Sequence, residues 1–173
     1  MDEVTLLSPD GVAIGVLAKD TVHTTDTPLH LAFSCYVVDG EGRLLVTRRA
    51  LSKRTWPGVW TNSFCGHPRP DETMQDAVTR RAQQELGLRI TDVAVVVPEY
   101  RYRAVDASGI VENEICPVHI AVADGALSPD PDEVSEWAWV DAAEFATAVA
   151  AAPFAFSPWL VEQLPLMRER GAV

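Results

Sequence analysis

Three histidines and a pair of glutamates could together bind a metal ion. His23 and His30 lie seven residues apart, and His67 lies in a segment rich in glycine and proline. Glu112 and Glu114 are separated by one residue, just before an apolar segment. Residues i and i+2 of a strand point to the same side, so both carboxylates could face one point. Imidazole and carboxylate ligands favour zinc, manganese or iron over magnesium.

Each of these residues also has a simpler interpretation. A single histidine is more often a surface or core residue than a ligand, and no spacing here matches a zinc signature such as CxxC or HExxH. The two glutamates could equally form the solvated end of a strand. The fourth histidine, His119, lies among valine and isoleucine and is interpreted as structural.

A second pattern lies on an expected helix that begins after Thr73 and ends at Gly87. The spacing G-x5-E-x7-R-x4-E-x-G is formed by Gly66, Glu72, Arg80, Glu85 and Gly87. This spacing resembles the Nudix box, in which carboxylates hold divalent metals against a diphosphate. Arg81 and Gln84 stand where that box carries two glutamates, which argues against a hydrolase. The same residues also fit an amphipathic surface helix with an Arg81–Glu85 pair at i,i+4.

The elements that must position these residues are short and mixed. We expect strands at residues 4–7, 12–17, 30–38, 44–48, 93–97, 100–104, 115–123 and 137–140. We expect further helices at 142–152 and from Pro158 onwards, the last one kinked or broken by Pro165. The absence of regular βαβ alternation predicts an α+β fold, a mixed β-sheet sandwich flanked by helices. The length predicts a single domain spanning residues 1–173.

The charge distribution indicates a small anionic ligand. The chain has 14 Lys+Arg, 25 Asp+Glu and a formal net charge of −11, which argues against nucleic acid or an anionic membrane as partner. Residues 43–103 nevertheless hold eleven cations and six anions. This basic segment could bind a small anion or form a solvated cationic face. The sparse cysteines and the lack of a signal peptide or an apolar span favour the cytoplasm.

Four longer segments are more specific than the box. The chain resembles type 1 isopentenyl diphosphate isomerases, a Nudix family, in TNSFCGHP (61–68), LLVTRRALSKRTWPGVWTNS (44–63), EYRYRAVDASGIVENEICPV (99–118) and AFSPWLVEQ (155–163). The resemblance implies a Nudix-like fold and a role in isoprenoid biosynthesis. It implies interconversion of isopentenyl and dimethylallyl diphosphate by a metal-assisted 1,3-allylic proton shift through a carbocation, without flavin or nicotinamide.

The resemblance also implies roles for individual side chains. Cys65 and Glu114 would carry out the proton transfers from opposite faces of the substrate, and which of them is the acid stays open. Tyr102 matches the family tyrosine near the acidic residue. Trp159 matches the tryptophan that covers the carbocation, since an indole face attracts cations. On their residue types alone, Cys65 could be a small buried hydrophobe and Trp159 a core anchor.

Two ligand sets follow from the same resemblance. The family's metal ligands map onto His23, His30, His67, Glu112 and Glu114, for one Mn, Zn or Mg ion. The diphosphate would be held by Lys19, Arg49, Lys53 and Arg81, with a substrate-bound Mg ion at Glu85. We expect this small-molecule substrate as the partner, and a monomer or weak homo-oligomer. A Nudix hydrolase of a nucleotide or prenyl diphosphate, and a metal-stabilised binding module without activity, are the alternatives.

Overall fold

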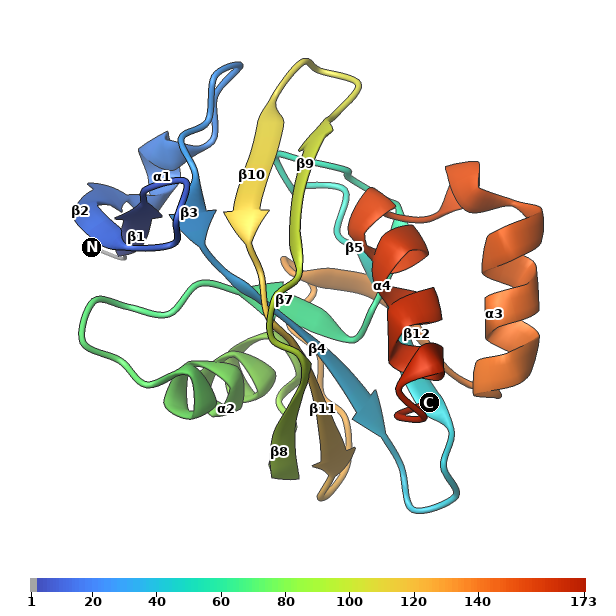
Figure 1. Ribbon diagram of the computed structural model, residues 1–173. Coiled ribbons are helices and arrows are strands. Elements are labelled where there is room, and N and C mark those ends of the chain that lie inside the picture. Colours follow the sequence, from blue (N-terminus) through green and yellow to red (C-terminus); the bar gives the residue numbers. More distant parts are fainter. Residues whose placement is uncertain (1–2) are drawn as a thin grey trace.

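The computed structural model describes residues 3–173, which form two sheets flanked by helices (Figure 1). The first sheet has the order β2-β1-β3-β10-β9. Its strands are β1 (Glu3–Leu7), β2 (Ala13–Ala18), β3 (His30–Leu31), β9 (Arg101–Val105) and β10 (Val111–Ile115). The second has the order β12-β5-β4-β11-β8, with β6 beside β5 and β7 beside β4. Its strands are β4 (Phe33–Val38), β5 (Leu44–Arg49), β6 (Trp60–Thr61), β7 (Phe64–Gly66), β8 (Ile90–Val97), β11 (Val118–Ala123) and β12 (Val134–Val140).

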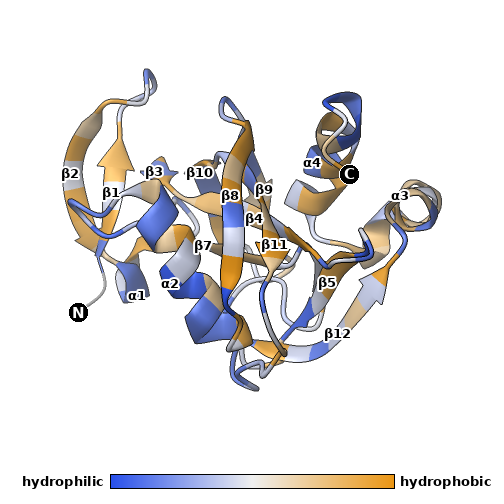
Figure 2. Cartoon of the chain, turned by 90° about the horizontal axis from the view of Figure 1, so that it is seen from below, coloured by the Kyte–Doolittle hydropathy of each residue, from blue (hydrophilic) through white to orange (hydrophobic). Residues whose placement is uncertain are grey.

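Helices cover both faces of the second sheet, which confirms the expected α+β sandwich. They are α1 (Lys19–Val22), α2 (Met74–Leu86), α3 (Ala142–Ala151), the 3-10 turn η1 (Pro153–Ala155) and α4 (Pro158–Glu169). Side chains of β4 alternate between two cores: Cys35 and Val37 pack towards α2, whereas Tyr36 packs towards α3 and α4. In Figure 2 the strands are coloured mainly hydrophobic and α2 mainly hydrophilic, as expected for a helix with one buried side.

Two expected strands are each divided where the chain passes from one sheet to the other. The strand expected at 30–38 is split at Ala32 into β3 and β4. The strand expected at 115–123 is split by Cys116 and Pro117 into β10 and β11. Both pairs run parallel, with His30 opposite Glu114 and Ser34 opposite Val118. An apolar run cannot reveal such a crossing, because its residues are buried on both sides of the break.

The expected ends of α2 are confirmed, and of the two effects expected of Pro165, a kink or a break, the break is wrong. Thr73 caps α2 by accepting a hydrogen bond from the Asp76 amide at 3.2 Å, and Gly87 ends it with φ of 58°. A side chain at Gly87 would meet the Ser128 carbonyl oxygen at 2.5 Å. Helix α4 continues past Pro165 to Glu169. Packing on the sheet compensates for the one amide hydrogen bond that proline removes.

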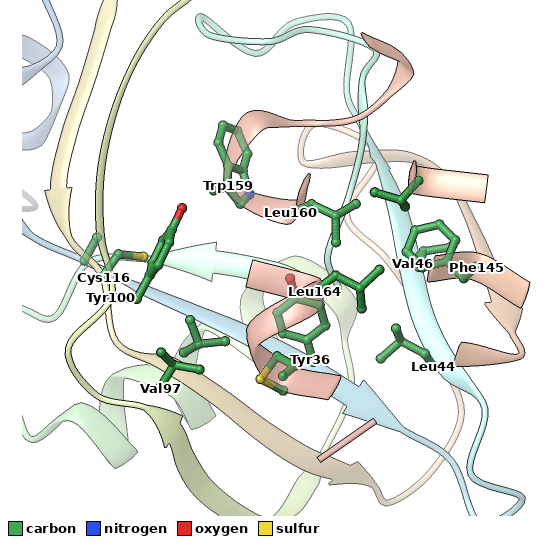
Figure 3. Close-up of a cluster of buried hydrophobic side chains, with 14 residues drawn as sticks. Tyr36, Leu44, Val46, Val97, Tyr100, Cys116, Phe145, Trp159, Leu160 and Leu164 are labelled. Atoms are coloured by element: carbon green, nitrogen blue, oxygen red, sulfur yellow. The ribbon is translucent and has the colours of Figure 1, made fainter. Parts of the chain in front are cut away.

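The core beneath α4 places the start of that helix. Figure 3 shows Leu160 and Leu164 packed with Tyr36 of β4 and with residues of β5 and α3. Trp159 precedes Leu160 at the edge of this cluster, and only 3% of its surface is exposed. Cys35 and Cys116 are buried, as expected for core residues. Within residues 3–173, no helix combines the length and apolar character needed to cross a membrane.

Candidate active site

A cavity of about 570 Å³ opens where the two sheets meet. It collects residues from α1, β5, the 50–70 segment, β7, α2, β9, β10 and α4. The lining residues are Lys19, Asp20, His23, Arg49, Lys53, Arg54, Thr55, Cys65, Gly66, His67, Arg81, Glu85, Tyr102, Glu112, Glu114 and Trp159. Of the side chains expected to act in a site, only His30 is missing from this lining, because it is fully buried.

The expected ligand histidines converge on Glu114. Parallel pairing of β3 and β10 sets His30 beside Glu114, and the Nε2 of His30 lies 3.4 Å from the Oε1 of Glu114. The Nε2 of His67 lies 3.2 Å from the same oxygen and 3.2 Å from the Nε2 of His30. One ligand atom from each of His23, His30, His67 and Glu114 lies within 4.8 Å of the others.

The donor atoms of this cluster fit a metal ion. Ligands about 2.1 Å from a metal are roughly 3.0–3.4 Å apart, which matches the separations just given. The Nε2 of His23 and the Oε2 of Glu112 are buried 2.9 Å apart without forming a hydrogen bond with each other or any other group. His30 donates through Nδ1 to the Pro28 carbonyl at 2.9 Å, which leaves Nε2 free to coordinate. This His/Glu cluster could therefore hold a metal ion.

Electrostatics keep Glu114 ionised. Burial alone would raise the pKa of Glu114, but hydrogen bonds and charge interactions with His30 and His67 hold it well below its usual range. Burial lowers the pKa of His67, which favours the neutral imidazole that a metal requires. The cluster thus presents an anionic carboxylate and a neutral ligand ring to the cavity.

Aromatic side chains of β9 and α4 line the same cavity as the cluster. The ring centroids of Tyr102 and Trp159 are 5.8 Å apart, and Tyr102 stacks on Tyr100 at 5.8 Å. Tyr102 lies opposite Glu114 in the β9–β10 register. Burial raises the pKa of Tyr102 well above its usual value, so its hydroxyl stays protonated. These aromatic side chains can stabilise a cationic, apolar group while keeping water away from it.

Cys65 contributes its thiol from β7. The Sγ atom lies 3.4 Å from the Ser34 hydroxyl oxygen and donates to the Oδ1 of Asn62 at 3.4 Å. Burial raises the pKa of the Cys65 thiol to about 12, so it is neutral at pH 7. The cavity therefore contains both a neutral thiol and an ionised carboxylate.

The other end of the cavity is cationic. Arg81 donates through Nε to Glu85 at 2.9 Å, and Lys53 forms an ion pair with Glu133. Arg49 donates to the Thr55 carbonyl at 2.9 Å, and its guanidinium lies 5.5 Å from the Trp159 ring centre. These charges can bind a compact anion such as a diphosphate.

Sequence reasoning missed several residues of this site. Asp20, Arg54 and Thr55 line the cavity, and Thr55 donates to the Oε1 of Glu112 at 2.8 Å. The signal for Arg54 and Thr55 was their place beside Lys53 in the irregular segment. Glu133 left no signal, because a loop residue far along the chain reaches Lys53 only through the fold.

The fold and the box define the class of protein. The family model described as NUDIX domain matches residues 28–160. The crystal structure of DR0079 from Deinococcus radiodurans superposes with a TM-score of 0.73 over 95% of this chain and 98% of that one. Sequence identity is 16%, so this likeness concerns the fold alone. The chain has the architecture of a NUDIX domain.

Curated relatives narrow the assignment. The isopentenyl-diphosphate Delta-isomerase of Clavibacter michiganensis is 63% identical over 164 residues, covering 95% of this chain and 84% of the relative. The isomerase of the same name from Leifsonia xyli is 56% identical over 168 residues, covering 96% and 91%. The chain belongs to the isopentenyl-diphosphate Delta-isomerase family.

Proposed function

We propose that the chain interconverts isopentenyl and dimethylallyl diphosphate in the cavity between the two sheets. One observation carries the proposal: a thiol and a carboxylate, Cys65 and Glu114, line the same cavity as several cations that suit a diphosphate. An isomerase needs both features in one enclosure, because the reacting carbons and the diphosphate belong to one small molecule.

The reaction adds a proton to one end of the allyl unit and removes a proton from the other. From isopentenyl diphosphate, the proton enters at C4 and leaves from C2, so the double bond moves and no electrons are gained or lost. Glu114 and Cys65 would serve the two ends, and Tyr102 would keep a hydroxyl near Glu114. The Trp159 ring would stabilise the tertiary cation between the two steps by roughly 2 kcal/mol.

Metal and diphosphate would occupy neighbouring parts of the cavity. His23, His30, His67, Glu112 and Glu114 would hold manganese, zinc or magnesium, which would supply positive charge that tunes the acidity of Glu114. Glu85 would bind a Mg ion that enters with the diphosphate. Lys19, Arg49, Lys53 and Arg81 would neutralise the phosphate oxygens. Arg81 suits this task because its fork can form two parallel hydrogen bonds.

The setting of the protein is part of the same proposal. We infer that residues 1–173 act as one domain and that they work in the cytoplasm. The three cysteines are unpaired in the fold, as is usual for proteins in a reducing compartment.

Deuterium incorporation tests the proposal. The protein is incubated with isopentenyl diphosphate and divalent metal in deuterated water, and the products are followed by mass spectrometry and phosphate release. We expect dimethylallyl diphosphate carrying deuterium at the new methyl group, and none above background from Cys65→Ala. Release of phosphate without isomerisation would instead support a hydrolase. If neither product formed, the remaining interpretation would be a binding module without activity.

A further inference from the structure

We propose that Asn62 is a positioning residue that fixes the thiol of Cys65 relative to the indole of Trp159. The inference rests on the proposed function, since it concerns the geometry of the reacting groups. Asn62 lies between β6 and β7, outside the cavity lining, and its side chain is fully buried.

The amide nitrogen of Asn62 sets the direction of the whole side chain. Nδ2 donates to the backbone carbonyl of Cys35 at 3.0 Å and to that of Phe64 at 2.8 Å. Carbonyl oxygens only accept hydrogen bonds, so the nitrogen must occupy this side. The Oδ1 atom is therefore fixed on the opposite side as an acceptor.

The Oδ1 atom of Asn62 contacts both the thiol of Cys65 and the indole of Trp159. Oδ1 accepts a hydrogen bond from the Nε1 of Trp159 at 2.9 Å and one from the Cys65 thiol at 3.4 Å. It also accepts one from the Thr61 hydroxyl at 2.9 Å. Sulfur and indole are thus held against one atom that cannot turn away from either.

A second series of buried hydrogen bonds connects helix α4, which carries Trp159, to the sulfur of Cys65. Gln163, one turn after Trp159 on α4, donates through Nε2 to the Ser34 hydroxyl at 2.9 Å. Its own oxygen accepts from the Tyr36 hydroxyl at 3.1 Å. Because Ser34 accepts from Gln163, its hydroxyl proton is free to point towards the Cys65 sulfur, 3.4 Å away, or the Cys116 sulfur. Helix α4 is therefore connected to the Cys65 sulfur by hydrogen bonds through Asn62 and through Ser34.

This arrangement determines what the thiol can reach. The inference assigns Cys65 to the C2 end of the allyl unit. A sulfur held at a fixed place beside the indole would meet one of the two hydrogens on C2 of a substrate lying on that ring. Without the Asn62 oxygen the thiol can rotate, and a misplacement of about 1 Å costs roughly 100-fold in rate. Of the four cations assigned to the diphosphate, only Arg49 lies against Trp159, 5.5 Å from its ring centre, so binding should change much less than kcat.

The experiment compares Asn62→Ala and Asn62→Leu with Ser63→Ala. Leucine has the branched shape of asparagine, with methyl groups in place of both Oδ1 and Nδ2, so it removes the acceptor without leaving a cavity. Ser63 is an equally buried neighbour that donates to the Leu45 carbonyl and accepts from the Val37 amide, both at 2.7 Å, so its loss costs comparable stability. Melting temperature, kcat and KM are measured, together with the C2 position that gains deuterium when dimethylallyl diphosphate reacts in deuterated water.

We expect both Asn62 variants to lose about 30- to 100-fold in kcat with KM changed less than threefold. Deuterium should spread over both C2 positions. Ser63→Ala should melt earlier but keep kcat within about twofold and label one position. Asn62 variants that match Ser63→Ala in kcat and labelling would overturn the inference, whereas a wild-type protein without isomerase activity would overturn the proposed function instead.

A measurement on the unaltered chain covers the case in which the Asn62 variants do not fold. The indole N–H resonance of Trp159 is assigned by its loss in Trp159→Phe, and its exchange with deuterated water is followed by NMR. We expect exchange far slower than for Trp137, which is 45% exposed. Equal exchange rates would show that Asn62 does not hold the indole and would reject the proposal.

Discussion

The alkaline limit of activity should be set by Lys53. Its ammonium group is partly buried beside the other cations of the cavity. Burial, together with the charges of Arg49, Arg81 and Lys19, lowers the pKa of Lys53 to about 8, although the charge of Glu85 opposes them. A lysine whose pKa is lowered is charged below pH 8 and loses its charge as the pH rises through that value. Binding of the anionic diphosphate should therefore weaken above about pH 8.

The size of this effect follows from the shift. A fall from 10.5 to about 8 corresponds to roughly 3 kcal/mol against the charged form. At pH 9 only about one Lys53 in ten is still charged. Because kcat/KM reports the free enzyme, it should fall about tenfold per pH unit above 8 until binding by the neutral amine takes over. Bound diphosphate raises the pKa again, so kcat should depend less on pH.

Lys53→Arg isolates the responsible group. A guanidinium stays charged throughout the accessible range, so kcat/KM of this variant should remain level from pH 7 to pH 9.5. For Lys53→Met, the uncharged control, kcat/KM should also be independent of pH over this range, but lower than in Lys53→Arg. Initial rates with isopentenyl diphosphate at fixed ionic strength give both profiles. An alkaline limb that persists unchanged in Lys53→Arg would refute the assignment.

Four further outcomes are expected. Glu114→Gln should lower kcat by about 1,000-fold or more while melting cooperatively, and a variant within tenfold of wild type would remove Glu114 from the proton transfer. Arg81→Ala should raise KM at least tenfold with kcat nearly unchanged, since the diphosphate does not react; a normal KM would contradict this role. Glu133→Gln should lower KM about fivefold, because this carboxylate competes with the diphosphate for Lys53, and a raised KM would mean that it binds substrate or its metal. Chelation should stop turnover and lower the melting temperature. A metal present at roughly 100 times its Kd before chelation corresponds to a fall of about 5–10 °C. An unchanged melting curve would mean that no metal binds in the His/Glu cluster.

The sequence predicts local elements well and long-range crossings poorly. Thr73 and Gly87 bound α2 because caps act within one turn. The antiparallel pairing of β4 with β5, with Val38 opposite Leu44, likewise joins strands that are adjacent in the chain. The division of the chain at Ala32 has no local signal, because it depends on β3 pairing with β10 and β4 with β11. Pro165 shows the opposite case: a strong local signal is overridden by the packing of α4 on the sheet.

The same distinction applies to the site. The spacing of Glu112 and Glu114 on one strand predicts that their side chains point to the same side. The three histidines could be predicted as metal ligands from their residue type and from the family resemblance. Their meeting point depends on the parallel register of His30 and Glu114, which no spacing specifies. Glu133 belongs to no motif, and Asn62 lies in the TNSFCGHP segment without an expected role, because the contacts of Glu133 with Lys53 and of Asn62 with Trp159 join residues far apart in the chain.

The box helix gives a physical reason why an isomerase on this fold would spare its diphosphate. Hydrolysis needs metal ions gathered by carboxylates around the bond to be broken. Here Arg81 is 7% exposed and engages Glu85, so a fixed cation stands where the box resemblance expects a metal-binding carboxylate. In the proposed function, Arg81 and Lys53 would neutralise phosphate oxygens without delivering an activated water. The chemistry would thereby be left to Cys65 and Glu114 at the allyl end. Replacing Arg81 by glutamate should test this division, with phosphate release rising above the wild-type level as isomerisation falls.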